Sequence, residues 1–338
     1  MKSYIPYSLL LAAAASGLAY GATAYTTPVG YITHSVTGSI AGSPSFTLLS
    51  PTLVQPTAWA GVSTAAPVGK AITASGTLPS GLNSQYFVEL TAAGVNNGWW
   101  ATVVSVSGST VTVTNNFPTG VLAGATFVIK KHNTIKSFLG SNAPGLDPGL
   151  GLDDADEVQV LNPATQGISS YFYALAVDGA PVDGWYDSGG NDANDTVIVP
   201  GTAVMAVRKK PGNTTFASSG EVKTTKTQAD IYKGYNWLSP MVATDVSLLA
   251  SNLNTGNTST GVQQGVDLSV DEVQFIPASQ SIAAYFAADF AQTGVNGWYD
   301  SGGNSSDSIL MQAPYGIQLV RKFNSSAVWT APAVVIGQ

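Results

Sequence analysis

The sequence predicts an all-β protein built from tandem sandwich-like or barrel-like modules, and three observations indicate this class. Short runs of apolar and β-branched residues recur along the chain, with Gly at 36 positions and Pro at 18 to mark turns between them. After the first residues, no segment keeps a sustained helical period. One eight-residue string also occurs twice. Short strands separated by frequent turns are typical of sandwiches and barrels.

The first expected element is an export signal at residues 1–24. A charged residue, Lys2, precedes an apolar run from Ile5 to Leu18, and residues 22–24 (ATA) give the small-x-small pattern that signal peptidase cleaves. The run is too short to span a bilayer, so we interpret it as a cleaved signal rather than as a membrane anchor or a buried helix. We therefore expect the mature chain to be secreted, extracellular or on the outer cell surface, without a transmembrane segment.

An internal repeat is the strongest signal in the mature chain. Residues 184–191 (GWYDSGGN) recur unchanged as residues 297–304, an identity that chance does not readily produce. Further matches flank the string in the same order, namely Asp156-Glu157 with Asp271-Glu272, Tyr171-Phe172 with Tyr285-Phe286, and Val207-Arg208-Lys209 with Val320-Arg321-Lys322. We expect each copy to fold as an equivalent strand-rich module.

These matches divide the mature chain into three modules and a linker. Two clear copies are expected at residues 133–210 and 233–338. A diverged copy is expected at residues 25–132, which hold Tyr-Phe and Gly-Trp pairs in the same order but a hairpin in place of the Asp-Ser-Gly-Gly segment. Residues 211–232 are rich in Lys, Thr, Ser and Gly, and we interpret them as a linker.

Strands are predicted from alternation and β-branched content. Residues 104–106 and 111–113 alternate strictly around a Ser-Gly-Ser turn, which predicts a hairpin with one buried face. Residues 197–199 and 203–207 are apolar runs on either side of a Pro-Gly-Thr turn. Residues 283–291 are rich in Ala, and we expect at most one helical turn or a short helix there.

Several features occur in one order in both clear copies, namely Tyr171-Phe172-Tyr173, Gly184-Trp185, Asp195, Pro200-Gly201-Thr202 and Val207-Arg208-Lys209 in the first, and Tyr285-Phe286, Gly297-Trp298, Asp307, Pro314 and Val320-Arg321-Lys322 in the second. This order resembles a family of secreted, repeat-containing β proteins of Verrucomicrobia-like bacteria, a family of uncharacterised function. The resemblance covers most of residues 30–322. It implies export and β architecture, and it assigns no catalytic residue. The later copy departs from the pattern at residues 312–315 (QAPY), which weakens any binding role for the Pro-Gly-Thr turn.

Composition narrows the classes of partner. Charged residues make up 10% of the chain and the net charge is −7, so a basic nucleic-acid-binding surface is not expected. The chain has no cysteine, which excludes disulfides and thiolate metal sites. We expect Ser, Thr, Asn and Gly to keep the surface soluble.

The Asp/Asn/Gly segment is the first candidate site. Asp187, Asn191, Asp192 and Asp195 offer the hard oxygen ligands that calcium prefers, although their spacing is not that of an EF-hand. A polar turn is the competing interpretation, because the same residue types are favoured by turn geometry alone. No other cofactor is expected.

The Trp-Tyr pairs are the second candidate site. Tyr186 with Asp187, and Tyr299 with Asp300, are the candidate ligand-binding residues, since aromatic rings stack on sugars and acids accept sugar hydroxyl groups. Each tyrosine is expected to be exposed, on the strand face opposite its preceding tryptophan. The tryptophans themselves are expected to fill the module cores.

Catalysis is not expected. The chain's two histidines, His34 and His132, lie in no metal-ligand spacing, and no Gly-x-Ser-x-Gly elbow is present. The sequence therefore predicts a non-catalytic structural or adhesive protein of the bacterial cell surface, with self-association or surface glycans as partners. The alternative is a lectin-like carbohydrate-binding protein that uses the Trp-Tyr-Asp loops, with calcium as an optional aid.

Overall fold

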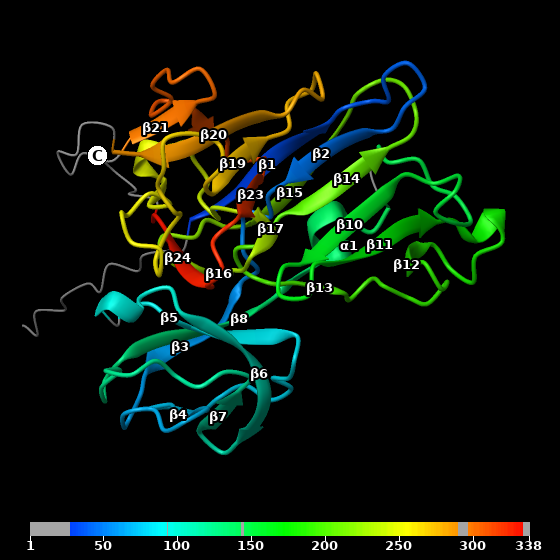
Figure 1. The fold of residues 1–338 in the computed structure, drawn as a ribbon. Coiled ribbons are helices and arrows are strands. Elements are labelled where there is room, and N and C mark those ends of the chain that lie inside the picture. The colour runs from blue at the N-terminus through cyan, green and yellow to red at the C-terminus, as the bar shows by residue number, and fades with distance from the viewer. Residues whose placement is uncertain (1–27, 93, 143–144, 290–296, 334–338) are drawn as a thin grey trace, which may run out of the picture.

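The computed structural model describes residues 28–92, 94–142, 145–289 and 297–333, and strands dominate its regular structure (Figure 1). The prediction of an all-β fold is confirmed. The signal peptide expected at residues 1–24 lies outside the described residues. Within these four ranges no helix is long and apolar enough to cross a membrane.

A five-stranded antiparallel sheet forms the centre of what we call the first unit, residues 28–54 and 133–221. Its strands are β2 (Ser45–Leu49), β10 (Glu157–Asn162), β11 (Gly167–Ala174), β12 (Gly184–Asp187) and β14 (Val204–Arg208), in the order β12-β11-β10-β14-β2. The flanking elements are β1 (Val29–Val36) paired with β15 (Thr214–Glu221), β9 (Asn133–Thr134) paired with β13 (Val197–Ile198), and the short helix α1 (Ile135–Leu139).

A second five-stranded sheet forms the centre of the second unit, residues 227–331. Its strands are β17 (Gly234–Leu238), β19 (Glu272–Phe275), β20 (Ala283–Ala288), β21 (Gly297–Asp300) and β23 (Ile317–Arg321), in the order β17-β23-β19-β20-β21. The flanking pairs are β16 (Thr227–Ile231) with β24 (Ala327–Ala331) and β18 (Val246–Ser247) with β22 (Leu310–Met311). The two sheets have the same strand order once β2 is matched with β17 and β12 with β21.

Residues 57–131 form a separate six-stranded sheet that we call the inserted domain. Its strands are β3 (Thr57–Val62), β4 (Ala71–Thr73), β5 (Tyr86–Leu90), β6 (Trp100–Ser107), β7 (Thr110–Val113) and β8 (Thr126–Lys131), in the order β3-β8-β5-β6-β7-β4. It interrupts the first unit between β2 and β9 and lies to one side of the two units (Figure 1). Its order differs from theirs, since β5 lies beside β8, whereas β19 separates the corresponding strands β20 and β23.

The structure corrects three expectations about the chain's organisation. Strands β1 and β2 fall within the N-terminal module expected at residues 25–132, but they pair with β15 and β14 of the first unit. Residues 211–232, expected to be a linker, contain β15 and β16. The Ala-rich segment expected to form a turn or short helix is strand β20, because hydrogen bonding to β19 and β21 on its two sides outweighs local propensity.

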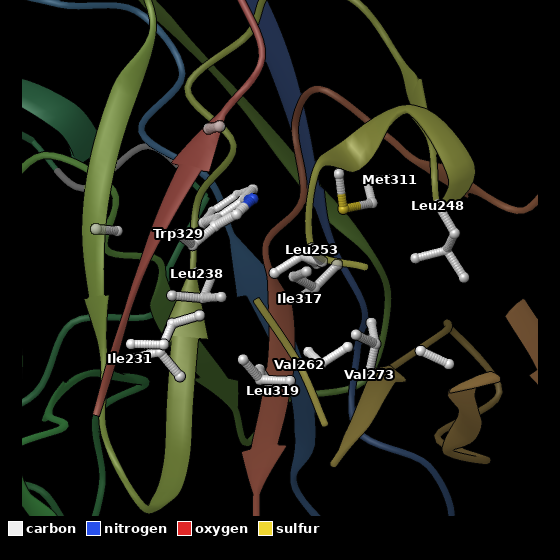
Figure 2. Close-up of a cluster of buried hydrophobic side chains, with 14 of the residues drawn as sticks. Ile231, Leu238, Leu248, Leu253, Val262, Val273, Met311, Ile317, Leu319 and Trp329 are labelled. Carbon is white, nitrogen blue, oxygen red and sulfur yellow. The ribbon is translucent and has the colours of Figure 1, made fainter. Parts of the chain in front are cut away.

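Each unit has its own apolar core, with a tryptophan at an equivalent position. Trp185 and Trp298 are the second residues of β12 and β21, and both are 0% exposed. Their predicted core role is confirmed, and burial of each contributes about 3 kcal/mol. Figure 2 shows the core of the second unit, where Trp329 of β24 lies close to Leu238, Leu253 and other buried aliphatic side chains.

The two units meet through reciprocal contacts. Gln166 in the β10–β11 turn accepts from the backbone N–H of Tyr235 at 2.7 Å and donates to its carbonyl at 3.1 Å. Gln280 in the β19–β20 turn makes the same pair with Phe46, at 2.7 and 3.1 Å. Leu48 and Trp237, on the equivalent strands β2 and β17, share one buried cluster between the units. Contacts in which each side uses the same positions are typical of a two-fold interface.

Candidate functional site

The repeated Asp-Ser-Gly-Gly-Asn loops fold as closed polar turns. The Asp187 carboxylate accepts from the backbone N–H groups of Gly189 and Asn191 at 2.8 and 2.9 Å, and from the Asn191 amide at 3.0 Å. Asp300 makes the same bonds to Gly302 and Asn304. Hydrogen bonds from the asparagine hold the pKa of each aspartate below its usual range. Turn closure therefore accounts for the identity at three positions of the string, namely Asp187, Gly189 and Asn191.

The candidate calcium ligands of the first unit lie around this turn. Asp192 accepts from the backbone N–H and the side-chain amide of Asn194, at 2.8 and 2.7 Å. Asp187 is engaged by Asn191 as described, and Asp195 is exposed. Across the described ranges, no group of three or more His, Cys, Asp or Glu side chains is arranged to hold a metal ion. The calcium site stays a prediction.

The expected exposure of the candidate tyrosines is wrong for Tyr186. Its side chain is 6% exposed, and its hydroxyl donates to the carbonyl of Val182 at 2.7 Å. Tyr299 is half-buried, and both rings contact the phenylalanine across the strand pair, at 6.2 Å between centroids. A face opposite a buried tryptophan is covered here because the loop around Val182 folds over it.

The repeated Asp-Glu and Arg-Lys pairs join strands within each unit. Arg208 donates to Asp156 at 2.7 Å, and Arg321 donates to Asp271 at 3.3 Å. Both carboxylates are buried and also accept a backbone N–H from the lysine that follows the arginine, at 2.7 Å. These residues therefore stabilise the fold of each unit, and we do not assign them to ligand binding.

A cleft of about 360 Å³ opens where the first unit, the second unit and the inserted domain meet. The first unit lines it with the β10–β11 hairpin and residues 196–202, and the second unit with residues 229–232 and Trp237. The inserted domain contributes one lining residue, Trp100. All three parts of the chain therefore contribute to the wall of the cleft.

Each of the three parts of the chain contributes at least one aromatic residue to the wall of the cleft. Trp100 starts β6, and its indole N–H donates to the carbonyl of Gln228 in β16 at 2.8 Å, which ties the inserted domain to the second unit. Tyr171 of β11 and Tyr232 after β16 are half-buried and line the same space. Half-buried rings in a concave wall offer flat apolar faces to a ligand at low entropic cost.

Asp230 is the single charged residue that lines the cleft among the residues described. Strand β16 alternates, with Thr227, Ala229 and Ile231 buried, so that Asp230 projects from the opposite face. Asp230 is exposed, and its side chain lines the cleft. Partial desolvation by the surrounding protein raises the pKa of its carboxyl group, and one long hydrogen bond from the Tyr232 hydroxyl, at 3.5 Å, opposes the rise.

The cleft continues into two further hollows. One, of about 220 Å³, shares Trp100 and Asp230 with the cleft and extends past Trp99. The other, of about 430 Å³, shares Tyr171 and extends toward Asp187 of the predicted site. Both hollows therefore lie beside the cleft.

The equivalent place on the other side of the unit interface is a hollow of about 310 Å³. It is lined by the β19–β20 turn and by Tyr315 and Gly316 of the second unit, and by Thr47 and Leu48 of the first. No residue of the inserted domain lines it among those described. The aromatic cleft therefore has a counterpart in position but not in composition.

Both histidines are buried in structural roles. His34 hydrogen-bonds the carbonyl of Pro314 at 3.0 Å and the hydroxyl of Ser218 at 2.9 Å. His132 hydrogen-bonds the hydroxyl of Thr102 at 3.1 Å. Burial lowers the pKa of each imidazole to about 4, so both are neutral near pH 7.

Sequence reasoning missed Asp230, Tyr232, Tyr171 and Trp100 as a group. Interpretation of residues 211–232 as a linker hid the strand that carries Asp230. The alternation of Thr227 to Ile231 was the available signal. The docking of Trp100 has no local signal, because its partner lies 128 residues away. Comparisons with protein-family models, curated proteins and solved structures gave no match to this chain.

Proposed function

We propose that this chain is an exported, non-catalytic carbohydrate-binding protein that attaches to glycans through the cleft between its three parts. The observation that carries the proposal is the Trp100 indole, held across the junction above a cavity of about 360 Å³. Export is supported by the signal-like residues 1–24.

The lining has the two kinds of group that sugar binding requires. Trp100, Tyr171 and Tyr232 offer flat apolar surfaces for the C–H face of a pyranose ring. Ser169, Thr196 and other short polar side chains in the wall offer hydrogen bonds to sugar hydroxyl groups. The two hollows beside the cleft provide room for neighbouring sugar units.

We propose binding without cleavage because the cleft that holds Trp100 contains a single acid group among the described residues. Glycoside hydrolysis commonly uses two carboxyl groups on either side of the scissile bond. Among the described residues that line the cleft, Asp230 is the single carboxyl. The two histidines do not line the cleft, because both side chains are buried and hydrogen-bonded to hydroxyl groups in the interior.

An adhesive role on the cell surface follows from the same site. A surface protein that holds a glycan with a pre-formed cleft links its cell to whatever displays that glycan. A purely structural role is the competing account, and it requires no occupied cleft. Calcium is not needed by this proposal, because the Asp187 turn lines only a neighbouring hollow and not the cleft that holds Trp100.

A glycan array on the purified mature chain tests the proposal. We expect binding of a defined set of oligosaccharides, lost in Trp100→Ala because the stacking surface is removed. Tyr31→Ala is the matched control, since Tyr31 is an aromatic residue on β1 that is 76% exposed and lines none of these hollows.

The outcomes separate the alternatives. Binding that survives Tyr31→Ala and disappears in Trp100→Ala supports the proposal, provided that both variants melt within a few degrees of the parent. An array without any signal, or Trp100→Ala binding as well as the parent, overturns it and favours the structural role.

A further inference from the structure

We infer that the glycan taken by the cleft carries protonated amines, as in oligomers of glucosamine, so that an ammonium group pairs with Asp230 beside the aromatic wall. This inference rests on the proposed carbohydrate-binding function and names the substrate class of the same site. Two features of the cleft wall support this inference, namely the charge of its lining residues and the position of Trp100 beside Asp230.

The charge of the lining has one sign. Asp230 lines both the cleft and the hollow that contains Trp99, and the third hollow contains Asp187 and Asp192. No Lys, Arg or His lines any of these three spaces among the residues that the structure describes. An anionic sugar such as a uronic acid would meet only repulsion here, whereas a cationic sugar is attracted.

Asp230 is exposed and has no cation beside it among the described residues, whereas the fully buried acids of those residues are all paired. Asp156, Asp271, Glu89 and Glu221 each form an ion pair with a lysine or arginine. Within the described ranges Asp230 forms no ion pair, and its side-chain contact is the 3.5 Å hydrogen bond from Tyr232. A carboxylate that is exposed in a cleft wall and has no counter-charge is free to pair with a cation of the ligand.

The aromatic wall favours the same ligand. Trp100 and Asp230 line two hollows in common, so a group seated between them meets an indole and a carboxylate together. Aromatic faces attract ammonium groups, with Trp the strongest of the three ring types. A glucosamine unit satisfies both demands, because its ring stacks and its protonated amine is attracted by ring and carboxylate. The N-acetylated sugar keeps the stacking but has no charge.

Calorimetric titration of the full mature chain provides the test, with the tetramers of glucosamine and of N-acetylglucosamine as probes at pH 6.5. We expect the glucosamine tetramer to bind at least about tenfold more tightly than the N-acetylated tetramer, and Asp230→Asn to remove that preference. Asp153→Asn is the matched control, since it removes one exposed charge outside the cleft. The preference should also shrink as salt is raised.

The results distinguish this inference from the proposed function. If both tetramers bind equally, or Asp230→Asn keeps the preference, the inference falls while carbohydrate binding stands. If spermidine binds as tightly as the glucosamine tetramer, the cleft recognises charge alone and the inference falls. If neither tetramer binds and the array is silent, the proposed function falls with it.

Discussion

The two buried histidines show what it costs to place a titratable ring in the interior. His34 joins β1 to the Pro314 carbonyl of the second unit, 280 residues away, and stacks on Phe216 with 4.8 Å between ring centroids. His132 packs against Phe87 at 4.8 Å. Neither ring has an acid partner that would stabilise its protonated form among the described residues. Protonation of either ring is therefore opposed by burial.

This opposition predicts a fall in stability at mildly acidic pH. Each imidazole has a pKa of about 4 in the folded chain and about 6.5 when unfolded, so the unfolded chain takes up more protons between those values. The free energy of unfolding should have its full value above pH 6.5, and it should decrease by about 3 kcal/mol for each histidine as the pH falls to 4. Urea denaturation at several pH values measures it.

His132→Gln provides the control for this pH dependence. The variant should be less stable at pH 7 but should lose roughly half of the decrease between pH 6.5 and 4.5. An unchanged slope would show that groups other than the histidines carry the acid sensitivity, and the assignment would be wrong.

At the scale of elements, the β10–β11 and β19–β20 turns combine a strained backbone with hydrogen bonds that join the two units. Gln166 and Gln280 have φ angles of 59° and 61°, a left-handed conformation that non-glycine residues seldom adopt. In return, each side chain forms two hydrogen bonds with the backbone of an edge strand in the other unit. The strain is thus offset by contacts that extend the opposite sheet.

Replacement of Gln280 separates the strain from the contacts. We expect Gln280→Ala to lower the free energy of unfolding by about 1–2 kcal/mol, since two partly exposed hydrogen bonds are lost while the φ strain remains. Gln280→Gly should lose less, by about 1 kcal/mol, because glycine adopts this φ freely. Chemical denaturation of both variants checks the order. A glycine variant less stable than the alanine variant would contradict this account.

Individual strands also show which parts of the fold could be predicted from the sequence. Strands with β-branched alternation, such as residues 111–113, were predicted because one buried face imposes a period of two. Strand β15 was missed because its Thr- and Ser-rich sequence is polar and its partner β1 lies about 180 residues earlier. The cleft was missed for the same reason, since its wall combines segments whose proximity depends on tertiary docking and not on local pattern.

For the whole molecule, the inserted domain is held to the two units by buried charge. Lys223, in the connection from β15 to β16, forms an ion pair with Glu89 of β5, and both side chains are 2% exposed. Beside it, Lys130 of β8 pairs with Glu221 of β15 at 2.9 Å. Since the inserted domain has its own apolar core, these ion pairs mainly stabilise its contact with the two units and not its internal fold.

Loss of one partner should therefore undock the inserted domain. Glu89→Gln leaves the Lys223 ammonium buried without a counter-charge, which costs about 3–5 kcal/mol. We expect the connection at residues 222–226 to become open to trypsin, which cleaves after Lys223 and Lys226, while the fragments stay folded. Limited proteolysis followed by mass spectrometry measures the site and rate of cleavage.

A matched variant tests the specificity of that effect. Glu272→Gln removes the partner of Lys322, whose side chain is 36% exposed, and should change the cleavage rate little, because such pairs contribute less than about 1 kcal/mol. Equal cleavage of Glu89→Gln and the parent protein would contradict a docking role for the buried pair.

The inserted domain interrupts only one of the two units, and this has a consequence for valency. The two hollows at the unit interface are equivalent in position, yet Trp100 reaches only one of them. A monomer should accordingly titrate with one equivalent of oligosaccharide rather than two. Under the proposed carbohydrate binding, firm attachment between surfaces would then depend on the density of chains displayed side by side.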